Sequence, residues 1–364
     1  MMQKGLKGVI AVETTIGHVD GEQGLLLYRG QPVETLTGTY SFEEVAFFLW
    51  YGHFPSPTEK ETFTCALKQA RSIPPYLQNV LQALPLETDQ MSVVRTAISA
   101  LGLPAYSFKP TIEEAITLTG IMPSIIAWWH RRQAGQPYLP ARSDLDHVEN
   151  YLYMLTGETH SHASVRALEN YMILTMEHGM NASTFAARVT VSSESDLVSS
   201  ITSALGTMKG PLHGGAPSGV IALLDEIAAS DGDCTRVLTK KLQQGERLMG
   251  FGHRVYKTKD PRAQALKAQL LQTAGDDPWL DLALQTETTA IELLQAYKPG
   301  RSLYTNVEFY AAAIMKAIGL APSLFTPTFS ASRVVGWSAH VLEQAADNTI
   351  FRPDAAYVGS WPQA

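Results

Sequence analysis

Three histidines lie in segments whose neighbouring residues suit catalysis. In KGPLHGGAPSG, His213 stands between glycines just before a helix that we expect to begin near Pro217 or Ser218. A helix N-terminus disfavours a positively charged imidazole, so His213 is expected to stay neutral and to donate one N–H to an oxygen that gains negative charge. The alternative is an ordinary turn histidine in a glycine-rich loop. The segment is not a phosphate-binding P-loop, because no Gly-Lys-Ser/Thr follows the glycines.

His253 opens a strongly cationic segment. In MGFGHRVYKTKDPRAQ it is followed within nine residues by Arg254, Lys257, Lys259 and Arg262. Two glycines and a proline bracket this segment, which is typical of a loop with a defined shape. Arginines in such a loop bind carboxylates or phosphates through paired N–H donors. The alternative is a charged face that contacts only solvent.

A third histidine and one isolated carboxylate complete the set. His178 in TMEHGMNAST lies at a turn between two helices, with Asn181 or Ser183 as the next N-cap. Taken alone, His178 is more typical of a helix C-terminus than of a ligand site. Glu308 in TNVEFYAAAIM sits at the edge of a run that suits a buried helix. Its alternative role is to cap the turn at Asn306.

Helix patterns dominate the segments that must position these residues. A capping box at Ser41 and Glu44 with a stop at Gly52 predicts one helix, and Thr58 with Glu61 predicts the start of the next. Further amphipathic runs cover residues 111–132, 144–157, 163–179, 194–210, 216–230, 260–275 and 331–347. Only GVIAVETTIGHVDGEQGLLLYRG favours a small β-hairpin or an extended arm. The sequence therefore predicts an all-α protein with a minor N-terminal hairpin or arm.

Composition and charge exclude several classes of function. The chain has 364 residues, of which 45% are hydrophobic and 17% charged, enough for one large domain or two unequal ones. A net charge of −7 excludes a broadly basic surface, so we expect no nucleic-acid partner. Cys65 and Cys234 lack the spacing of a disulfide framework or a metal site and are expected to be reduced.

Neither a membrane segment nor a metal site is expected. The most apolar span, TGIMPSIIAWWH, is too short to cross a bilayer, and the N-terminus lacks the continuous apolar stretch of a secretory signal. A cytoplasmic location is therefore expected. A metal site built from His160, His162 and His178 is disfavoured, because no carboxylate or cysteine stands at a metal-ligand spacing from them.

Five ordered motifs carry a resemblance to a known family. KGPLHGGA, GFGHRVYKTKDPR, EHGMNAST, NVEFY and SRVVGW…FRPDAAYVG resemble the citrate synthase family, in its shorter bacterial and archaeal type, and the opening segment resembles that family's N-terminus. The resemblance implies an almost entirely helical homodimer. It also implies a large helical domain, residues 1–214 plus 320–364, and a smaller inserted helical domain, residues 215–319, with the active site in the cleft between them.

The resemblance implies three catalytic residues. His213 matches the histidine that hydrogen-bonds the thioester carbonyl of acetyl-CoA and stabilises its enol. His253 matches the histidine that polarises the ketone of oxaloacetate and gives a proton to the new alkoxide. Glu308 stands where the family's base takes a proton from the methyl group, but the usual residue there is Asp. The extra methylene moves the carboxylate by roughly 1.5 Å on an unchanged backbone.

Substrate-binding residues follow from the same resemblance. His178, Arg262 and Arg333 match residues that hold the oxaloacetate carboxylates, and Arg352 matches an arginine that reaches in from the partner subunit. A dicarboxylate that leaves water needs fixed cations, and arginine supplies them without a protonation equilibrium. From charge alone, Lys257 and Lys259 are candidates to face the phosphates of CoA.

Two classes of function remain open at this stage. The first is an acyltransferase that condenses acetyl-CoA with oxaloacetate and hydrolyses citryl-CoA to citrate and CoA, a step of the tricarboxylic acid cycle that needs no metal or redox cofactor. Its close variant is a 2-methylcitrate synthase that takes propionyl-CoA, which the motifs do not separate from the first. The second class is a regulatory or ligand-binding paralogue of low activity, because Glu308 replaces the usual Asp.

Overall fold

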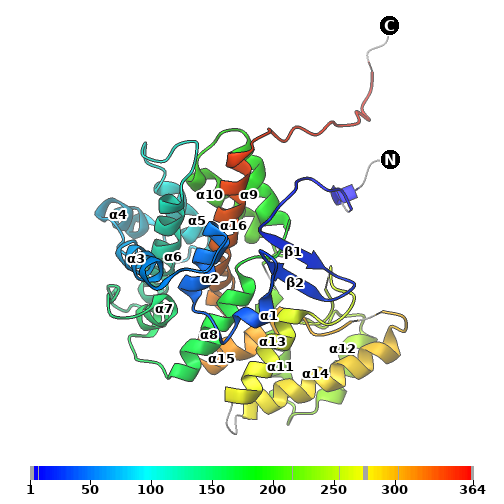
Figure 1. Cartoon of the computed structure of the whole chain (residues 1–364). Helices are drawn as coiled ribbons and strands as arrows, with labels where there is room; N and C mark the ends of the chain where they lie inside the picture. Colours follow the sequence, from blue (N-terminus) through cyan, green and yellow to red (C-terminus); the bar gives the residue numbers. More distant parts are fainter. Residues whose placement is uncertain are drawn as a thin grey trace.

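The structure, a computed structural model, describes residues 4–6, 8–214, 216–253, 255–273, 278–301 and 303–361. It is mostly helical (Figure 1), which confirms the expected fold class. The helices of the first part are α1 (Val33–Leu36), α2 (Phe42–Tyr51), α3 (Pro57–Gln69), α4 (Pro75–Ala83), α5 (Gln90–Ala100), α6 (Ile112–Gln133), α7 (His147–Thr156), α8 (His162–Thr175), α9 (Ala182–Ser192) and α10 (Leu197–Met208). Those of the second part are α11 (Ala216–Ala228), α12 (Cys234–Gln243), α13 (Pro261–Thr273), α14 (Pro278–Tyr297), α15 (Val307–Ala317) and α16 (Phe325–Ala346), and short 3-10 helices cover Lys4–Leu6 and Pro322–Leu324.

A small antiparallel sheet precedes the helices, so the expected hairpin is confirmed. Its strands, in the order β1-β2-β3, are β1 (Gly17–Asp20), β2 (Leu25–Tyr28) and β3 (Gln31–Pro32). Asp20 shapes the turn between β1 and β2, because its Oδ1 accepts two backbone N–H groups of the turn, each at 2.9 Å. Tyr28 is fully buried, and its hydroxyl donates to the backbone C=O of Glu177 at 3.0 Å. The sheet is thereby fastened to the turn that follows α8.

The helix caps agree with the sequence prediction at α2 and differ from it at α3. Ser41 and Glu44 form the expected capping box of α2. The expected cap at Thr58 is wrong: the N-cap of α3 lies two residues earlier, and its capping box is formed by Ser56 and Glu59. The proline that follows Ser56 explains the shift, because its fixed φ and missing N–H suit the first position of a helix.

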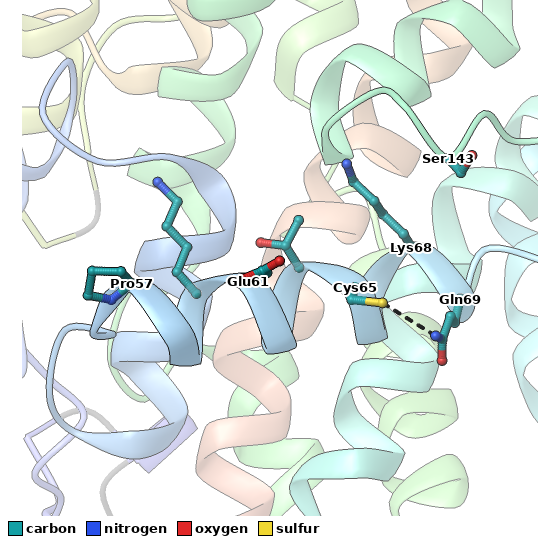
Figure 2. A pocket seen from close by; sticks show the side chains of 8 residues that line it. Pro57, Glu61, Cys65, Lys68, Gln69 and Ser143 are labelled. Atoms are coloured by element: carbon teal, nitrogen blue, oxygen red, sulfur yellow. Dashed lines mark hydrogen bonds between the residues drawn. The ribbon is translucent and has the colours of Figure 1, made fainter.

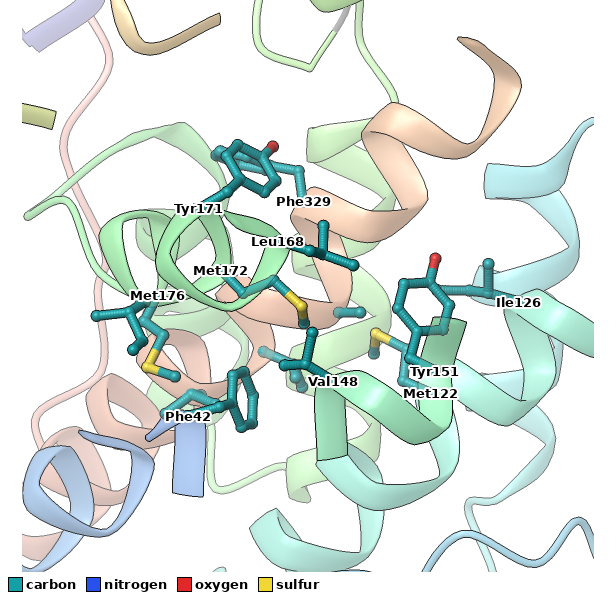
Figure 3. Close-up of a cluster of buried hydrophobic side chains, with 14 of the residues drawn as sticks. Phe42, Met122, Ile126, Val148, Tyr151, Leu168, Tyr171, Met172, Met176 and Phe329 are labelled. Atoms are coloured by element: carbon teal, nitrogen blue, oxygen red, sulfur yellow. The ribbon is translucent and has the colours of Figure 1, made fainter. Parts of the chain in front are cut away.

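The long helix α16 organises the main core. It packs against α2, α6, α8, α9 and α10, and Figure 1 shows it running through the middle of these helices. Figure 3 shows part of the buried cluster, in which Phe42, Met122, Tyr151 and Met172 come from α2, α6, α7 and α8, and Phe329 of α16 lies beside Tyr171. The core therefore fixes the C-terminal end of α8, from which the chain enters the candidate site.

A second, smaller hydrophobic cluster lies among α11, α12 and α14. Leu223, Leu238 and Leu294 are among its buried members. In contrast, α13 and α15 place buried residues such as Leu266 and Phe309 in the main cluster. The division into residues 1–214 plus 320–364 and residues 215–319 stays a prediction.

The chain leaves the helical body after α16. Residues 348–361 form no helix or strand and extend away from the body in Figure 1. In the described ranges, the structure contains no helix with both the length and the apolarity that crossing a membrane requires.

Candidate functional site

Three segments that are far apart in the sequence meet at one place: the turn after α8, the loop before α13 and the N-terminus of α15. Gly252 N–H donates to the C=O of Tyr304 at 2.7 Å, and Asn306 N–H donates to the C=O of Gly250 at 2.9 Å. Gly250 and Gly252 have positive φ angles of 87° and 84°, and a Cβ on Gly250 would lie 2.9 Å from the ring of Phe309. The loop that carries His253 is thus held rigidly against the helix that carries Glu308.

The site brings together His178 and His253, as the sequence predicts. Their ring centroids are 5.5 Å apart. Tyr256 links them, because its hydroxyl lies 3.1 Å from His178 Nε2 and its ring centroid lies 4.7 Å from that of His253. Burial lowers the pKa of His178 well below its usual value, and the positive charge of Arg262 adds to the effect. His178 is therefore neutral at pH 7.

His253 has a defined tautomer. Its Nδ1 accepts the backbone N–H groups of Val255 and Tyr256 at 3.0 and 3.1 Å. Burial, followed by the charge of Arg262, lowers its pKa to about 4. A neutral ring that accepts at Nδ1 carries its proton on Nε2. Arg262 Nη2 lies 3.4 Å from Nε2, a longer contact than the two at Nδ1. In the tautomer set by the shorter contacts, His253 can donate one hydrogen bond from Nε2 to a substrate oxygen.

His213 has the opposite tautomer. Its Nε2 lies 2.7 Å from Ser183 Oγ and also accepts the backbone N–H of Ser183 at 3.3 Å. Because a backbone N–H only donates, the ring proton of neutral His213 is on Nδ1. Its pKa is lowered to about 4 by burial and then by the charge of Arg333. Trp337 Nε1 donates to the same Ser183 Oγ at 3.0 Å and holds it in place.

Asp260 is a part of the site that the sequence reasoning did not single out. It pairs with Arg262 through two contacts, Nε to Oδ1 at 3.0 Å and Nη2 to Oδ2 at 2.8 Å, and both side chains are nearly fully buried. Asp260 Oδ2 also accepts the N–H of Val307 at 3.2 Å, at the start of α15. Burial by itself would raise the pKa of Asp260, but Arg262 holds it below its usual value. Asp260 thus fixes both an arginine and the helix that carries Glu308.

The carboxyl group of Glu308 is largely shielded from solvent. The side chain keeps some exposed surface, but its Oε2 atom has none, and no hydrogen-bond partner for this atom exists among the described residues. Burial raises the pKa of Glu308 to about 7, although Arg262 opposes the shift. The alternative role as a cap is wrong, because the bond runs the other way: Asn306 Oδ1 accepts the N–H of Glu308 at 3.1 Å.

Arg333 lies at the centre of the charges in the site. It is nearly fully buried in α16, and its Nε donates to the C=O of Thr175 at 2.6 Å. Its positive charge acts on the pKa values of His178, His213 and Glu308. The guanidinium donors of an arginine suit a carboxylate ligand.

Three other predicted residues lie outside this cluster. Arg352 is exposed on the segment that follows α16. Lys257 is exposed and forms an ion pair with Glu22. Lys259 is exposed and lines a cavity of about 260 Å³ beside α13 and α14. Arg254 lies outside the described residues.

A larger hollow lies on α3, away from the site. It has a volume of about 760 Å³ (Figure 2) and is lined by Pro57, Lys60, Glu61, Thr64, Cys65, Lys68, Gln69 and Ser143. None of these residues belongs to the three segments of the site. Within the ranges that the structure describes, no group of three His, Cys, Asp or Glu side chains is arranged to hold a metal ion; His160 Nε2 instead lies 2.8 Å from Thr156 Oγ1.

Comparisons with known proteins agree with this arrangement. The family model "Citrate synthase, C-terminal domain" matches residues 5–354. The chain belongs to the citrate synthase family. It is therefore an enzyme of the acyltransferase class, with the helical fold of that family.

Individual members of the citrate synthase family match over nearly their whole length. The citrate synthase of Haloferax volcanii is 37% identical, over 98% of this chain and 96% of that protein. The 2-methylcitrate synthase of Mycobacterium tuberculosis is 38% identical, over 98% of this chain and 91% of that protein. A solved citrate synthase from Thermoplasma acidophilum, in a ternary complex with carboxymethyl coenzyme A and oxaloacetate, has a TM-score of 0.90 and 29% identity, covering 100% of this chain and 98% of that one.

Proposed function

We propose that the chain is a citrate synthase, which condenses acetyl-CoA with oxaloacetate and water to give citrate and CoA. One observation carries this proposal: the Glu308 carboxyl, with a pKa of about 7, shares a buried site with Arg262, Arg333 and neutral histidines. A weakly acidic methyl group needs a base that is deprotonated near neutral pH, and a dicarboxylate needs fixed cations.

The first step is enolisation of acetyl-CoA. Glu308 takes a proton from the methyl group, and the electron pair of that C–H bond moves toward the thioester carbonyl. The Nδ1–H of His213 donates a hydrogen bond to the carbonyl oxygen, which gains negative charge. A preorganised hydrogen-bond donor stabilises such an oxygen. Ser183 holds the His213 ring in position through its contacts with Nε2.

The second step joins the two substrates. The Nε2–H of His253 polarises the ketone of oxaloacetate, and the enol carbon forms a bond to the ketone carbon. The new alkoxide takes a proton from His253 to give citryl-CoA, and the proton that Glu308 removed from the methyl group replaces the one that His253 has given up. Water then cleaves the thioester to citrate and CoA. Arg262, Arg333 and His178 hold the oxaloacetate carboxylates during these steps, as the family motifs imply.

Further parts of the proposal rest on the sequence. The scheme uses acetyl-CoA as a substrate and calls for no cofactor, and Lys257 and Lys259 are proposed to face the CoA phosphates. The reaction is proposed to take place in the cytoplasm as a step of the tricarboxylic acid cycle.

A 2-methylcitrate synthase is the second candidate, because a relative with that name is 38% identical to this chain. A low-activity paralogue is the third, because of Glu308. Release of CoA, measured with oxaloacetate and either acetyl-CoA or propionyl-CoA, separates the three. A higher kcat/KM with acetyl-CoA supports the main proposal, a higher value with propionyl-CoA supports the second candidate, and no release with either supports the third.

We expect each site to be shared between two subunits. Arg352 is exposed on the segment that extends from the helical body (Figure 1), and the family motif places it in the partner's site. Arg352→Ala and His213→Ala subunits, refolded together, should recover about a quarter of wild-type activity, because half of the mixed dimers are heterodimers with one intact site each. Activity no higher than that of the separate variants would contradict shared sites.

The pH dependence should report Glu308. Its pKa is raised to about 7, and only the deprotonated form accepts a proton, so kcat/KM should fall about tenfold per pH unit below this value and level off above it. His213 and His253, with pKa values of about 4, stay neutral between pH 5.5 and 8 and therefore do not change kcat/KM in this range. A profile of CoA release that is flat between pH 5.5 and 8 would contradict this assignment.

A further inference from the structure

A buried polar chain that the reaction scheme does not use joins the turn carrying His178 to α9 and α16. It consists of Arg188 in α9, His340 in α16 and Glu177 in the turn, and we call it the Glu177 relay. The exposed fractions of the three side chains are 1%, 0% and 0%. Burying ionisable groups is costly unless they are paired, so a relay of this kind is expected to have a role.

Arg188 determines where the proton of His340 lies. Its Nε and Nη2 lie 3.0 and 2.7 Å from His340 Nδ1. Arginine only donates, so Nδ1 accepts and the ring carries its proton on Nε2. That Nε2 lies 3.0 Å from Glu177 Oε2, but the N–H is not aligned with the oxygen as in a hydrogen bond, and neither atom has a hydrogen-bond partner in the described part of the chain. His340 therefore places the positive end of its N–H dipole beside the Glu177 carboxylate.

Glu177 in turn holds the backbone on both sides of His178. Its Oε1 accepts the N–H of Gly179, and its own N–H and C=O both bond to the hydroxyl of Tyr28, each at 3.0 Å. Helix α16 comes unusually close here: a Cβ on Gly336 would lie 2.8 Å from Glu177 Oε2. The conformation that points His178 at Tyr256 thus depends on the position of one carboxylate.

Each element tied by the relay also carries a residue of the proposed site. Helix α9 carries Ser183, the partner of His213, and α16 carries Arg333. Burial lowers the pKa of Arg333, and the negative charge of Glu177 is the largest effect that acts in the other direction. At its outer end the relay is anchored by Glu343, which pairs with Arg188 and accepts the N–H of Thr15 at 2.9 Å.

We propose that the Glu177 relay positions His178 for oxaloacetate. In this relay, His340 of α16, held by Arg188 of α9, keeps the Glu177 carboxylate of the turn in place. This inference rests on the proposed function, in that it takes His178 as a ligand of an oxaloacetate carboxylate. His340 touches no substrate and is a positioning residue. Without the Nε2–H of His340, the Glu177 carboxylate can move. Because that carboxylate accepts the N–H of Gly179, the backbone that orients His178 can then move as well.

Substitution of His340 by Asn or by Gln distinguishes the roles of its two ring nitrogens. Asn places its side-chain oxygen near Nδ1 and nothing near Nε2, whereas Gln extends an N–H to the Nε2 position. Calorimetric titration of the full chain with oxaloacetate alone should show a Kd raised about 10-fold by His340→Asn, because the buried Glu177 Oε2 loses the polar group beside it. His340→Gln should lie within about 3-fold of wild type. The KM for acetyl-CoA should change less than the Kd for oxaloacetate in both variants.

His147 supplies the matched control. It is also a buried helical histidine, stacked on Phe42 at 4.4 Å, but it contacts no residue of the site. His147→Asn should lower thermal stability and leave the oxaloacetate Kd unchanged. An equal Kd for wild type and His340→Asn, or an equal rise for His147→Asn and His340→Asn, would overturn the proposal.

Two arrangements keep the test decisive. If His340→Asn does not fold, Glu343→Gln at the partly exposed end of the relay is titrated in its place; a Kd raised about 3-fold supports the relay and an unchanged Kd overturns it. Titration also reports separately from turnover. Suppose that wild type binds oxaloacetate, that His340→Asn weakens this binding, and that wild type releases no CoA. This outcome contradicts the proposed function and not the relay.

Discussion

Glu308→Gln should lower the rate of CoA release by about 10² to 10⁴ and leave oxaloacetate affinity nearly unchanged. The substitution keeps the size of the side chain and removes only the proton acceptor. The buried Oε2 atom and the pKa of about 7 are the features that suit Glu308 to this role. The rate is measured by CoA release at saturating oxaloacetate, and the affinity by titration.

The control for Glu308→Gln is Glu158→Gln, the same change at an exposed position after α7. It should have wild-type activity. Glu308→Asp then asks whether the pocket has adapted to the longer side chain. An adapted pocket should lose activity on the order of 10²-fold with Asp, since the carboxylate retreats by roughly 1.5 Å from the methyl group. Wild-type rates from the Gln variant would show that Glu308 is not the base.

Asp260→Asn should lower the free energy of unfolding by about 3–5 kcal/mol, because it leaves the buried Arg262 without its counter-charge. Asp260 and Arg262 are 1% and 3% exposed, so solvent screens this pair little. The loss is measured by denaturant unfolding at pH 7. The same variant should also lose activity, because Asp260 holds both Arg262 and the start of α15.

A partly exposed ion pair provides the comparison for Asp260→Asn. Asp225 pairs with Lys316, and their side chains are 52% and 38% exposed, so Asp225→Asn should cost less than about 1 kcal/mol. The pKa of Asp260 is held below its usual value in the fold. Its contribution is therefore present above the unfolded pKa of about 3.9 and is lost as the pH falls through the folded pKa. Equal losses from the two variants at pH 7 would contradict a special role for the buried pair.

Much of the fold could be predicted from local signals, because caps and periodicity act over a few residues. The capping box at Ser41 and the turn at Asp20 are examples. The N-cap of α3 was misplaced because Ser56 and Thr58 offer competing boxes, and the proline between them decides in favour of Ser56. Helix α14 is not among the helices predicted from the sequence, although its buried positions Leu280, Ala283, Ala290 and Leu294 follow a helical spacing.

The site was only partly predictable, because motifs name residues but not their partners. His178, His253, Glu308, Arg262 and Arg333 stand out in the sequence, and the structure gathers them in one place. Their tautomers and charges depend on contacts between distant segments, which local patterns do not encode. The contact between Ser183 and His213, and that between Glu177 and His340, join residues 30 and more positions apart.

The nature of the bond that the enzyme forms tests the central claim most directly. Acetyl-CoA labelled with ¹³C at the methyl carbon is mixed with oxaloacetate labelled with ¹³C at the ketone carbon, and the product is examined by NMR. The proposed reaction predicts citrate in which the two labelled carbons are directly coupled, formed in step with CoA release. Release of CoA with labelled acetate and unchanged oxaloacetate would show simple thioester hydrolysis and would contradict the account.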